Sequence, residues 1–347
     1  MRLTLLTTLL GLTALTLETT ASPQPLDLVP RTTPTTTKKK ITITVKKVIT
    51  IRRVVSTSTK KATTTTKKTS TTTKKPTTTS KLTPIIKATT APSASRKRGL
   101  AWPWDNTDSP SLFLAPTSPP ITWLYNWETW TPSKLPSTLP YVPMQRTPAD
   151  IQTLQRRLVN LSKQRKITHF LGFNEPDMQS QADVGPSEAA RLWKVYVNPL
   201  KGSVSGLKIG APAMSNGAAG ITWFKDFLKA CNGGCTMDFL PLHWYGPPQL
   251  SHLQSHISQY HSLLPSLPIW LTEYAPTTWQ ASNPLPLSTV TQFMRDSTAW
   301  LDKTDYIERY AWFVPARSFA DKSIGSNILL MTPSGGVSAL GKVYAGL

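Results

Sequence analysis

Several kinds of functional site are disfavoured by what the sequence lacks. Among 347 residues there are two cysteines and five histidines, and no HExxH pattern occurs, so we expect no metal centre. GxSxG, GxGxxG and Walker A motifs are also absent, which argues against a serine hydrolase and against a nucleotide-binding protein. No apolar run approaches the roughly 18 residues that indicate a transmembrane helix. We therefore predict no metal, no cofactor and no membrane span.

Acidic residues are almost absent from the first part of the chain. Residues 1–98 hold 20 of the 39 lysines and arginines but only two acids, Glu18 and Asp27. Residues 99–347 hold the other 19 basic residues together with 16 acids. The formal charge of +21 is therefore mostly a property of the first part. Because the remainder has no strong basic excess, we predict no nucleic-acid partner.

The first 98 residues divide into two segments, and neither has the composition of a globular domain. Residues 1–21 have a charged start at Arg2, an apolar Leu/Thr-rich stretch and small residues before position 22, as a secretory signal peptide does. Residues 22–98 are rich in threonine and lysine, with 24 threonines among residues 31–90. Such a segment buries too little apolar surface to offset its ordering entropy, so we predict a disordered linker. A basic arm that binds an acidic wall polymer or a membrane surface is the alternative.

A pair of basic residues, Lys97-Arg98, stands immediately before residue 99. It resembles a processing site for a secretory-pathway protease, and cleavage there would make residues 22–98 a pro-segment. The alternative is that these residues are the last charges of the linker. In either case we expect one folded domain over residues 99–347, because all 12 tryptophans lie after residue 101.

Two covalent features would follow from secretion. Cys231 and Cys235 are separated by three residues, and in an oxidising compartment they predict a short-loop disulfide. A pair of free thiols is the alternative. Asn160 begins the single Asn-x-Ser/Thr sequon of the chain and is a candidate glycosylation site, although it falls inside a predicted helix.

Strand and helix signals alternate after residue 99. Apolar runs predict eight strands, over residues 99–104, 121–127, 141–145, 168–174, 207–213, 237–245, 268–274 and 307–314. Apolar spacing predicts helices over residues 149–164, 187–201, 221–230, 250–264, 288–302 and 338–345. Continuous apolar strands alternating with helices indicate a parallel sheet covered on both faces. The count and the length predict an α/β fold of the (β/α)8 barrel type, with a doubly wound open sheet as the alternative.

Two of the predicted strands end in a glutamate that proline follows. One run stops at Asn174-Glu175-Pro176, and the other leads to Glu273 with Pro276 three residues further on. Proline cannot donate to a ladder, so it marks the strand end. Glycoside cleavage needs one carboxyl group that protonates the leaving oxygen and another that attacks the sugar or activates water. We predict Glu175 as the acid/base and Glu273 as the nucleophile; a helix cap or structural ion pairs are the alternatives.

The other predicted strand ends collect polar and aromatic side chains, as the active-site face of a barrel does. We predict that Asn174 binds a sugar hydroxyl, and that His243 and Tyr245, which share one side of a strand, hold the charge and geometry of the carboxylates. Trp104 also lies at a strand end. Aromatic rings stack on sugar faces, so we predict substrate contacts from Trp127, Trp244, Trp312 and Tyr274. Each of these residues has a place in the core as its alternative.

Four short motifs together resemble one known family. They are Lys-Arg-Gly-Leu-Ala-Trp at 97–102, Phe-Asn-Glu-Pro-Asp at 173–177, His-Trp-Tyr at 243–245 and Leu-Thr-Glu-Tyr at 271–274. In this order they resemble glycoside hydrolase family 128, the glycosyl hydrolase catalytic core family, over about residues 97–347. The resemblance implies a (β/α)8 barrel and endo-acting hydrolysis of β-1,3-glucan with retention, with Glu175 as the acid/base and Glu273 as the nucleophile.

The resemblance leaves the activity open in one respect, because the family also contains members that bind glucan with little cleavage. A non-hydrolytic glucan-binding protein that anchors to the wall, and a transglycosylase, are therefore alternatives to a hydrolase. Together with the predicted signal peptide, the resemblance implies a fungal protein secreted to the cell wall. Its expected partner is a polysaccharide, β-glucan, and we expect a monomer.

Overall fold

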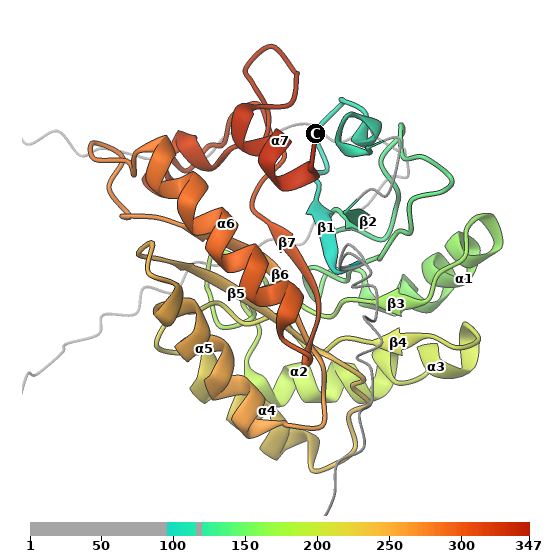
Figure 1. Ribbon diagram of the computed structural model, residues 1–347. Coiled ribbons are helices and arrows are strands. Elements are labelled where there is room, and N and C mark those ends of the chain that lie inside the picture. Colours follow the sequence, from blue (N-terminus) through green and yellow to red (C-terminus); the bar gives the residue numbers. More distant parts are fainter. Residues whose placement is uncertain (1–95, 116–119) are drawn as a thin grey trace, which may run out of the picture. The chain divides into compact units, whose positions relative to one another are not determined.

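The computed structural model describes residues 96–115 and 120–347 (Figure 1). The predicted signal peptide, and the predicted linker up to residue 95, lie outside the described residues. Within the described ranges, no helix combines the length and the apolar character needed to cross a bilayer.

Five strands form one parallel sheet. They are β1 (Arg98–Ala101), β2 (Ile121–Tyr125), β5 (Leu240–Gly246), β6 (Ile269–Pro276) and β7 (Ile307–Trp312), in the order β2-β1-β7-β6-β5. Two short strands, β3 (His169–Phe170) and β4 (Lys208–Ile209), form a second parallel pair. All of these pairings are parallel, which confirms the prediction of an α/β fold with a parallel sheet.

Isolated parallel bridges join the two sheets on both sides. On one side they pair Leu124 with Tyr141 and Met144 with Leu171; on the other they pair Gly210 with Phe239 and Met214 with Leu242. The predicted strand over 141–145 is therefore present only as bridges. Pro140 and Pro143 explain this difference, because a proline has no N–H to donate to a ladder. Their carbonyl groups still accept, from the backbone N–H groups of Leu124 and Leu171 respectively.

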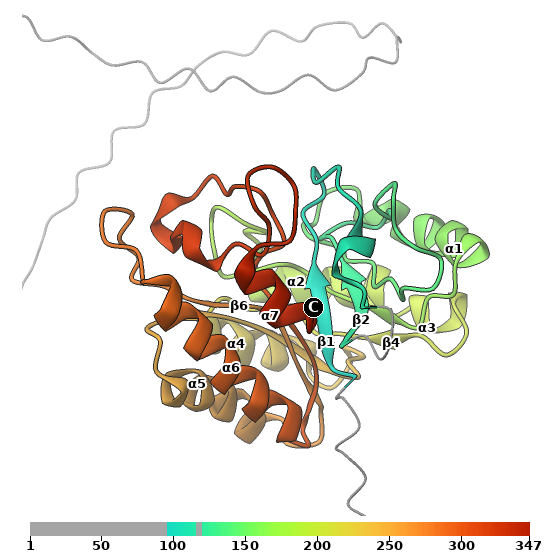
Figure 2. The same cartoon turned by 45° about the horizontal axis from the view of Figure 1, so that its top comes forward.

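The helices lie around the outside of the strands (Figures 1 and 2). The α-helices are α1 (Leu154–Gln164), α2 (Pro186–Leu192), α3 (Leu200–Ser203), α4 (Gly220–Cys231), α5 (Leu250–Leu263), α6 (Leu287–Lys303) and α7 (Ala339–Ala345). The single helix predicted over 187–201 is instead α2, a π-helical segment (Trp193–Val197) and α3. Pro199, which has no N–H for the helical ladder, stands at the start of α3 and accounts for the break. Short 3-10 helices occur at Pro110–Phe113, Ile151–Thr153, Lys322–Ile324 and Ser326–Ile328.

A cluster of rings fills the molecule at the amino ends of the strands. Trp270, near the start of β6, stacks on Phe239, and their ring centroids lie 4.1 Å apart. Arg309 lies on the neighbouring strand β7, and its guanidinium is 4.3 Å from the centroid of the Trp270 ring. Because this end is closed by apolar packing, polar side chains inside the strands collect at the carboxyl ends.

The basic pair before residue 99 belongs to the sheet. Arg98 is the first residue of β1, and its guanidinium donates to the Tyr310 hydroxyl at 2.8 Å, to Asp302 at 3.1 Å and to the Tyr344 carbonyl at 3.0 Å. The Lys97 ammonium donates to two backbone carbonyls at the end of α6. The described fold thus begins before the predicted start at residue 99.

Candidate active site

The backbone at Glu175 is held in an unusual conformation. Its φ is 41°, in the left-handed region that costs a non-glycine residue on the order of 1–3 kcal/mol. Two backbone hydrogen bonds fix it: the Glu175 N–H donates to the Ala213 carbonyl at 2.7 Å, and the Met178 N–H donates to the Glu175 carbonyl at 3.0 Å. Pro176 follows and ends the extended segment after β3. This extended segment thus stops at the residue whose side chain enters the site.

Glu273 lies within β6, between two irregularities in strand pairing. The register shifts between Leu242 and His243 of β5 and between Leu271 and Tyr274 of β6. The Glu273 carboxylate is buried and accepts two strong hydrogen bonds. The Trp127 indole N–H donates to its Oε1 at 2.7 Å, and the Tyr245 hydroxyl donates to its Oε2 at 2.6 Å.

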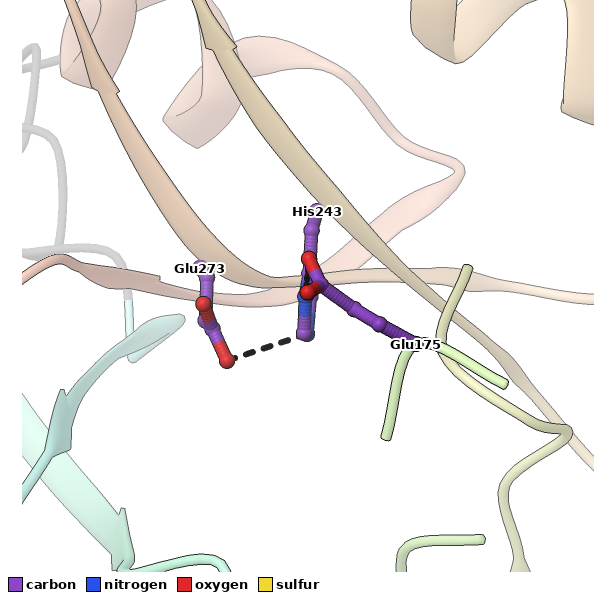
Figure 3. A group of neighbouring side chains, drawn as sticks. All are labelled: Glu175, His243 and Glu273. Atoms are coloured by element: carbon purple, nitrogen blue, oxygen red, sulfur yellow. Dashed lines mark hydrogen bonds and ion pairs between the residues drawn. The ribbon is translucent and has the colours of Figure 1, made fainter. Parts of the chain in front are cut away.

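The His243 imidazole lies between the two glutamates (Figure 3). Its Nδ1 is 2.9 Å from Glu175 Oε1, and its Nε2 is 3.4 Å from Glu273 Oε1. One atom from each of the three side chains lies within 4.8 Å of the other two. His243 has no exposed surface, and both carboxylates are buried. The structure therefore brings the two predicted glutamates, which are 98 positions apart in the sequence, into one ionisable cluster.

Burial and the neighbouring charges shift the pKa values of this cluster. Burial raises the pKa of Glu273, and repulsion from Glu175 adds to the rise, while the charge of His243 and the two hydrogen-bond donors partly offset it. Burial alone would lower the pKa of His243, but Glu273 and Glu175 together raise it above its ordinary value. Burial also raises the pKa of Tyr245 well above its usual range, so its hydroxyl remains a donor.

The same three side chains are the one group among the described residues whose spacing would suit a metal ion. Their hydrogen bonding argues against a cation. Both nitrogens of His243 face carboxylates, and the oxygens of Glu273 accept from an N–H and an O–H group that would be directed at a bound ion. The arrangement of these three side chains fits a protonated imidazole between two carboxyl groups better than it fits a metal ion.

A cavity of about 1280 Å³ opens above the cluster. Glu175, Glu273, Asn174, Tyr245 and Trp127 line it, while His243 lies beneath them. The Asn174 amide N–H donates to Gln181 at 3.2 Å, and its buried Oδ1 has no protein partner. An unpartnered carbonyl oxygen beside the carboxylates suits a hydroxyl donor on a ligand.

Three residues predicted to contact substrate lie elsewhere. Trp244 is buried and stacks on Phe293 of α6 with 5.4 Å between ring centroids. Tyr274 and Trp312 are fully buried and pack edge to face against each other at 5.0 Å. The reason is alternation: along a strand, neighbours of an inward-facing residue point outward to the helices. The structure assigns Trp244, Tyr274 and Trp312 to the core rather than to the cavity wall.

Two tryptophans that were not selected from the sequence stand at the cavity instead. Trp104 is 50% exposed and meets Trp127 edge to face at 6.3 Å. Trp279 is 52% exposed and meets Tyr245 at 6.0 Å. The position of Trp104 at a strand end was a usable signal. Trp279 lies in the loop after β6, and no periodicity marks such a loop residue.

The other predicted sites lie on the helical layer. Cys231, the last residue of α4, forms the predicted disulfide with Cys235. Asn160 is exposed on α1, and its glycosylation remains a prediction.

Two buried carboxylates that face each other below a large cavity are an arrangement typical of glycosidases. Residues 99–344 match the model of the family described as "Glycosyl hydrolase catalytic core". The chain therefore belongs to the glycosyl hydrolase catalytic core family.

Similarity to a curated relative and to several solved structures supports this family assignment. Alkali-sensitive linkage protein 1 of Schizosaccharomyces pombe is 34% identical over 254 residues, which are 73% of this chain and 45% of that protein. The chain thus spans less than half the length of this relative.

The similar structures are glycoside hydrolase family 128 enzymes. An endo-β-1,3-glucanase from Lentinula edodes has a TM-score of 0.61 and 29% identity, with 72% of this chain and 100% of that chain covered. An exo-β-1,3-glucanase from Aureobasidium namibiae has a TM-score of 0.63 and 26% identity, with 73% and 96% covered. A curdlan-specific exo-β-1,3-glucanase from Blastomyces gilchristii has a TM-score of 0.60 and 29% identity, with 74% and 100% covered.

Proposed function

We propose that this chain is a secreted retaining endo-β-1,3-glucanase that acts on cell-wall glucan. The observation that carries the proposal is the short separation of the two carboxylates, which lie within 4.8 Å of each other at the bottom of the cavity. Retaining glycosidases place their two carboxyl groups about 5–5.5 Å apart, whereas inverting enzymes leave about 6.5–9.5 Å for a water molecule. The substrate follows from the similar structures, which are β-1,3-glucanases.

The fold that we propose is a (β/α)8 barrel. The parallel bridges on both sides of β3 and β4 support it, because they continue the pairing from β2 through residues 141–144 and back to β5. Counting residues 141–144 as a strand gives eight, the number of such a barrel. In this fold the active site lies at the carboxyl ends of the strands, where Glu175 and Glu273 lie.

The proposed reaction proceeds in two displacements. Glu273 attacks the anomeric carbon and forms a glycosyl ester, while the bond to the leaving oxygen breaks and that oxygen takes the proton of Glu175. Water then attacks the same carbon, gives its proton to Glu175 and releases Glu273 as a carboxylate. The donors Trp127 and Tyr245 support the role of Glu273 as the nucleophile, since both hydrogen bonds favour its ionised form.

The arrangement of the aromatic side chains supports endo cleavage. Trp127 and Tyr245 bind the two different oxygens of Glu273, and each meets one exposed indole, Trp104 or Trp279. Trp104 follows β1, whereas Trp279 follows β6. Stacking platforms on both sides of the nucleophile would hold sugar units on both sides of the bond that breaks, as internal cleavage requires.

The proposed secretion has two supports. The Cys231–Cys235 disulfide is typical of oxidising compartments, and the sequence predicts a signal peptide. A wall glucan is an extracellular polymer, so secretion and substrate agree.

The test is a laminarin digest with the full chain and with Glu175→Gln and Glu273→Gln. We expect reducing ends from the wild type, a loss of at least about 100-fold in each variant, short oligosaccharides of several lengths, and β-configured first products by NMR. Release of glucose alone would refute endo action, and α-configured first products would refute retention. Binding without release by all three proteins would instead favour a glucan-binding protein, and products longer than the substrate would favour a transglycosylase.

A further inference from the structure

The side-chain amide of an asparagine at the cavity makes the hydrogen bonds that the backbone of a neighbouring strand would otherwise make. Asn216 lies in the segment after β4, and both ends of its side-chain amide bind the backbone of Tyr245. Its Nδ2 donates to the Tyr245 carbonyl at 2.9 Å, and its Oδ1 accepts from the Tyr245 N–H at 2.9 Å. The last backbone bridge between these segments is at Met214 and Leu242, two residues before Asn216 and three before Tyr245. The amide thus continues the pairing beyond the point where the backbones separate.

The segment that carries Asn216 is itself tied to the loop of Glu175. Asp177 lies two residues after Glu175, and its carboxylate accepts from the Ser215 N–H at 3.0 Å and from the Ser215 hydroxyl at 2.5 Å. The Ser215 hydroxyl oxygen also accepts from the Gly217 N–H at 3.1 Å. Hydrogen bonds on both sides of Asn216 therefore fix the backbone from which its side chain reaches Tyr245.

The far end of this path is Glu273. The Tyr245 hydroxyl donates to Glu273 Oε2 at 2.6 Å, and the direction of the Tyr245 side chain depends on the strand backbone that Asn216 holds. Its ring meets Phe313 and Trp279 only edge to face, at 5.4 and 6.0 Å, which leaves the ring without a stacked neighbour. The backbone clamp therefore adds to the pairing of β5 with β6 in restraining where the hydroxyl points.

We propose that Asn216 is a positioning residue that holds the Tyr245 hydroxyl on Glu273, and that Asp177 and Ser215 extend this path to the loop of Glu175. The inference rests on the proposed glucanase function for its kinetic consequence. It makes the hydrogen bonding of one carboxylate depend on the loop that carries the other, by a route separate from His243.

The experiment compares Asn216→Ala, Tyr245→Phe and the double variant in the full chain. Asn198→Ala is the matched control, because the Asn198 amide makes the same kind of two-sided clamp, donating to the Gly234 carbonyl at 2.7 Å and accepting from the Thr236 N–H at 2.9 Å. Asn198 lies between the π-helical segment and α3 and is not among the residues that line the cavity. Laminarin kcat and KM are measured across pH, together with thermal unfolding at about pH 4 and about pH 8.

We expect Asn216→Ala to lower kcat roughly fivefold to tenfold with little change in KM, the effect of one misplaced hydrogen bond. The acidic limb of kcat should move to higher pH, as in Tyr245→Phe, and the double variant should match Tyr245→Phe within about twofold, since both act on one bond. A double variant whose loss of kcat is the product of the two single losses would overturn the proposal. An unchanged acidic limb in Asn216→Ala would also overturn it.

Thermal unfolding gives a test that does not depend on the proposed activity. Losing a donor to Glu273 costs more stability where Glu273 is ionised, so Asn216→Ala and Tyr245→Phe should lose more Tm at the higher pH. Asn198→Ala should lose the same Tm at both. An inactive wild type would refute the glucanase function alone, whereas equal losses of Tm at both pH values in Asn216→Ala would refute the positioning role.

Discussion

Replacing His243 with glutamine tests the charge balance of the active site directly. Glutamine has similar reach and its amide NH2 group can donate hydrogen bonds, but it carries no positive charge. In the wild type, Nε2 of His243 lies 3.4 Å from Glu273 Oε1. At an effective dielectric constant of about 20, unit charges at that distance attract by about 5 kcal/mol. Because the imidazolium charge is shared with Glu175, we assign about half of this energy to Glu273, so the loss of His243 raises the pKa of Glu273 further.

The expected sign follows from the proposed role of Glu273 as the nucleophile. A nucleophile must be ionised, so a higher pKa leaves less active enzyme at any pH below it. The acidic limb of kcat/KM for His243→Gln should therefore move to higher pH, with a loss of roughly 100-fold on that limb. The effect should shrink toward neutral and alkaline pH, where Glu273 is ionised in both proteins.

The assay is laminarin hydrolysis across pH with wild type, His243→Gln and His252→Gln. His252 is exposed on α5 and serves as the matched control. An acidic limb in the same place for wild type and His243→Gln would refute the reasoning, because it would mean that His243 carries no charge that Glu273 senses. A uniform loss at every pH would refute it equally, since it would indicate misfolding or lost geometry.

Three further predictions follow from single contacts. Trp127→Phe keeps an aromatic ring but removes the N–H that donates to Glu273 Oε1 at 2.7 Å. We expect the transition state to lose about 1.5–3 kcal/mol of stabilisation, which lowers kcat/KM roughly 10- to 100-fold on the acidic limb. The measurement is a pH–rate profile. Trp104→Ala and Trp279→Ala each remove an exposed platform, and we expect KM for laminarin to rise about 10-fold with unchanged Tm, measured by kinetics and thermal unfolding. Serine at both Cys231 and Cys235 should lower the free energy of unfolding by about 2 kcal/mol, a small effect because the loop is short, measured by denaturant titration.

The main features of the fold could be predicted from the sequence because apolar periodicity decides them. Strands β6 and β7 and helices α5 and α6 lie where the predictions placed them to within two residues. The predicted strand over 141–145 is present only as isolated bridges for a local reason, because two prolines have no N–H to donate to a ladder. The segment still pairs in parallel with its neighbours. Periodicity alone does not separate a regular strand from a row of bridges.

The candidate site was predictable where the strand-end pattern is sharp, at Glu175 and Glu273. It was not predictable where side-chain direction matters. Trp244 stands between His243 and Tyr245 in the sequence, yet it faces the helices while its neighbours face the two glutamates. Trp279 and Asn216 lie in loops whose course depends on tertiary contacts, so no signal in the sequence marks their positions.

The place of Arg98 in β1 has a consequence for the timing of maturation. The peptide after Arg98 runs between β2 and β7, with Gly99 paired to Trp123 on one side and to Ala311 on the other. A protease needs an accessible, extended chain, so a cut there has to precede the docking of β1 or wait for its release. It would also separate the guanidinium that links β7, α6 and α7 from the rest of the strand. Cleavage of this bond would therefore weaken the domain that it leaves behind, whereas a cut before residue 96 would keep the Arg98 contacts.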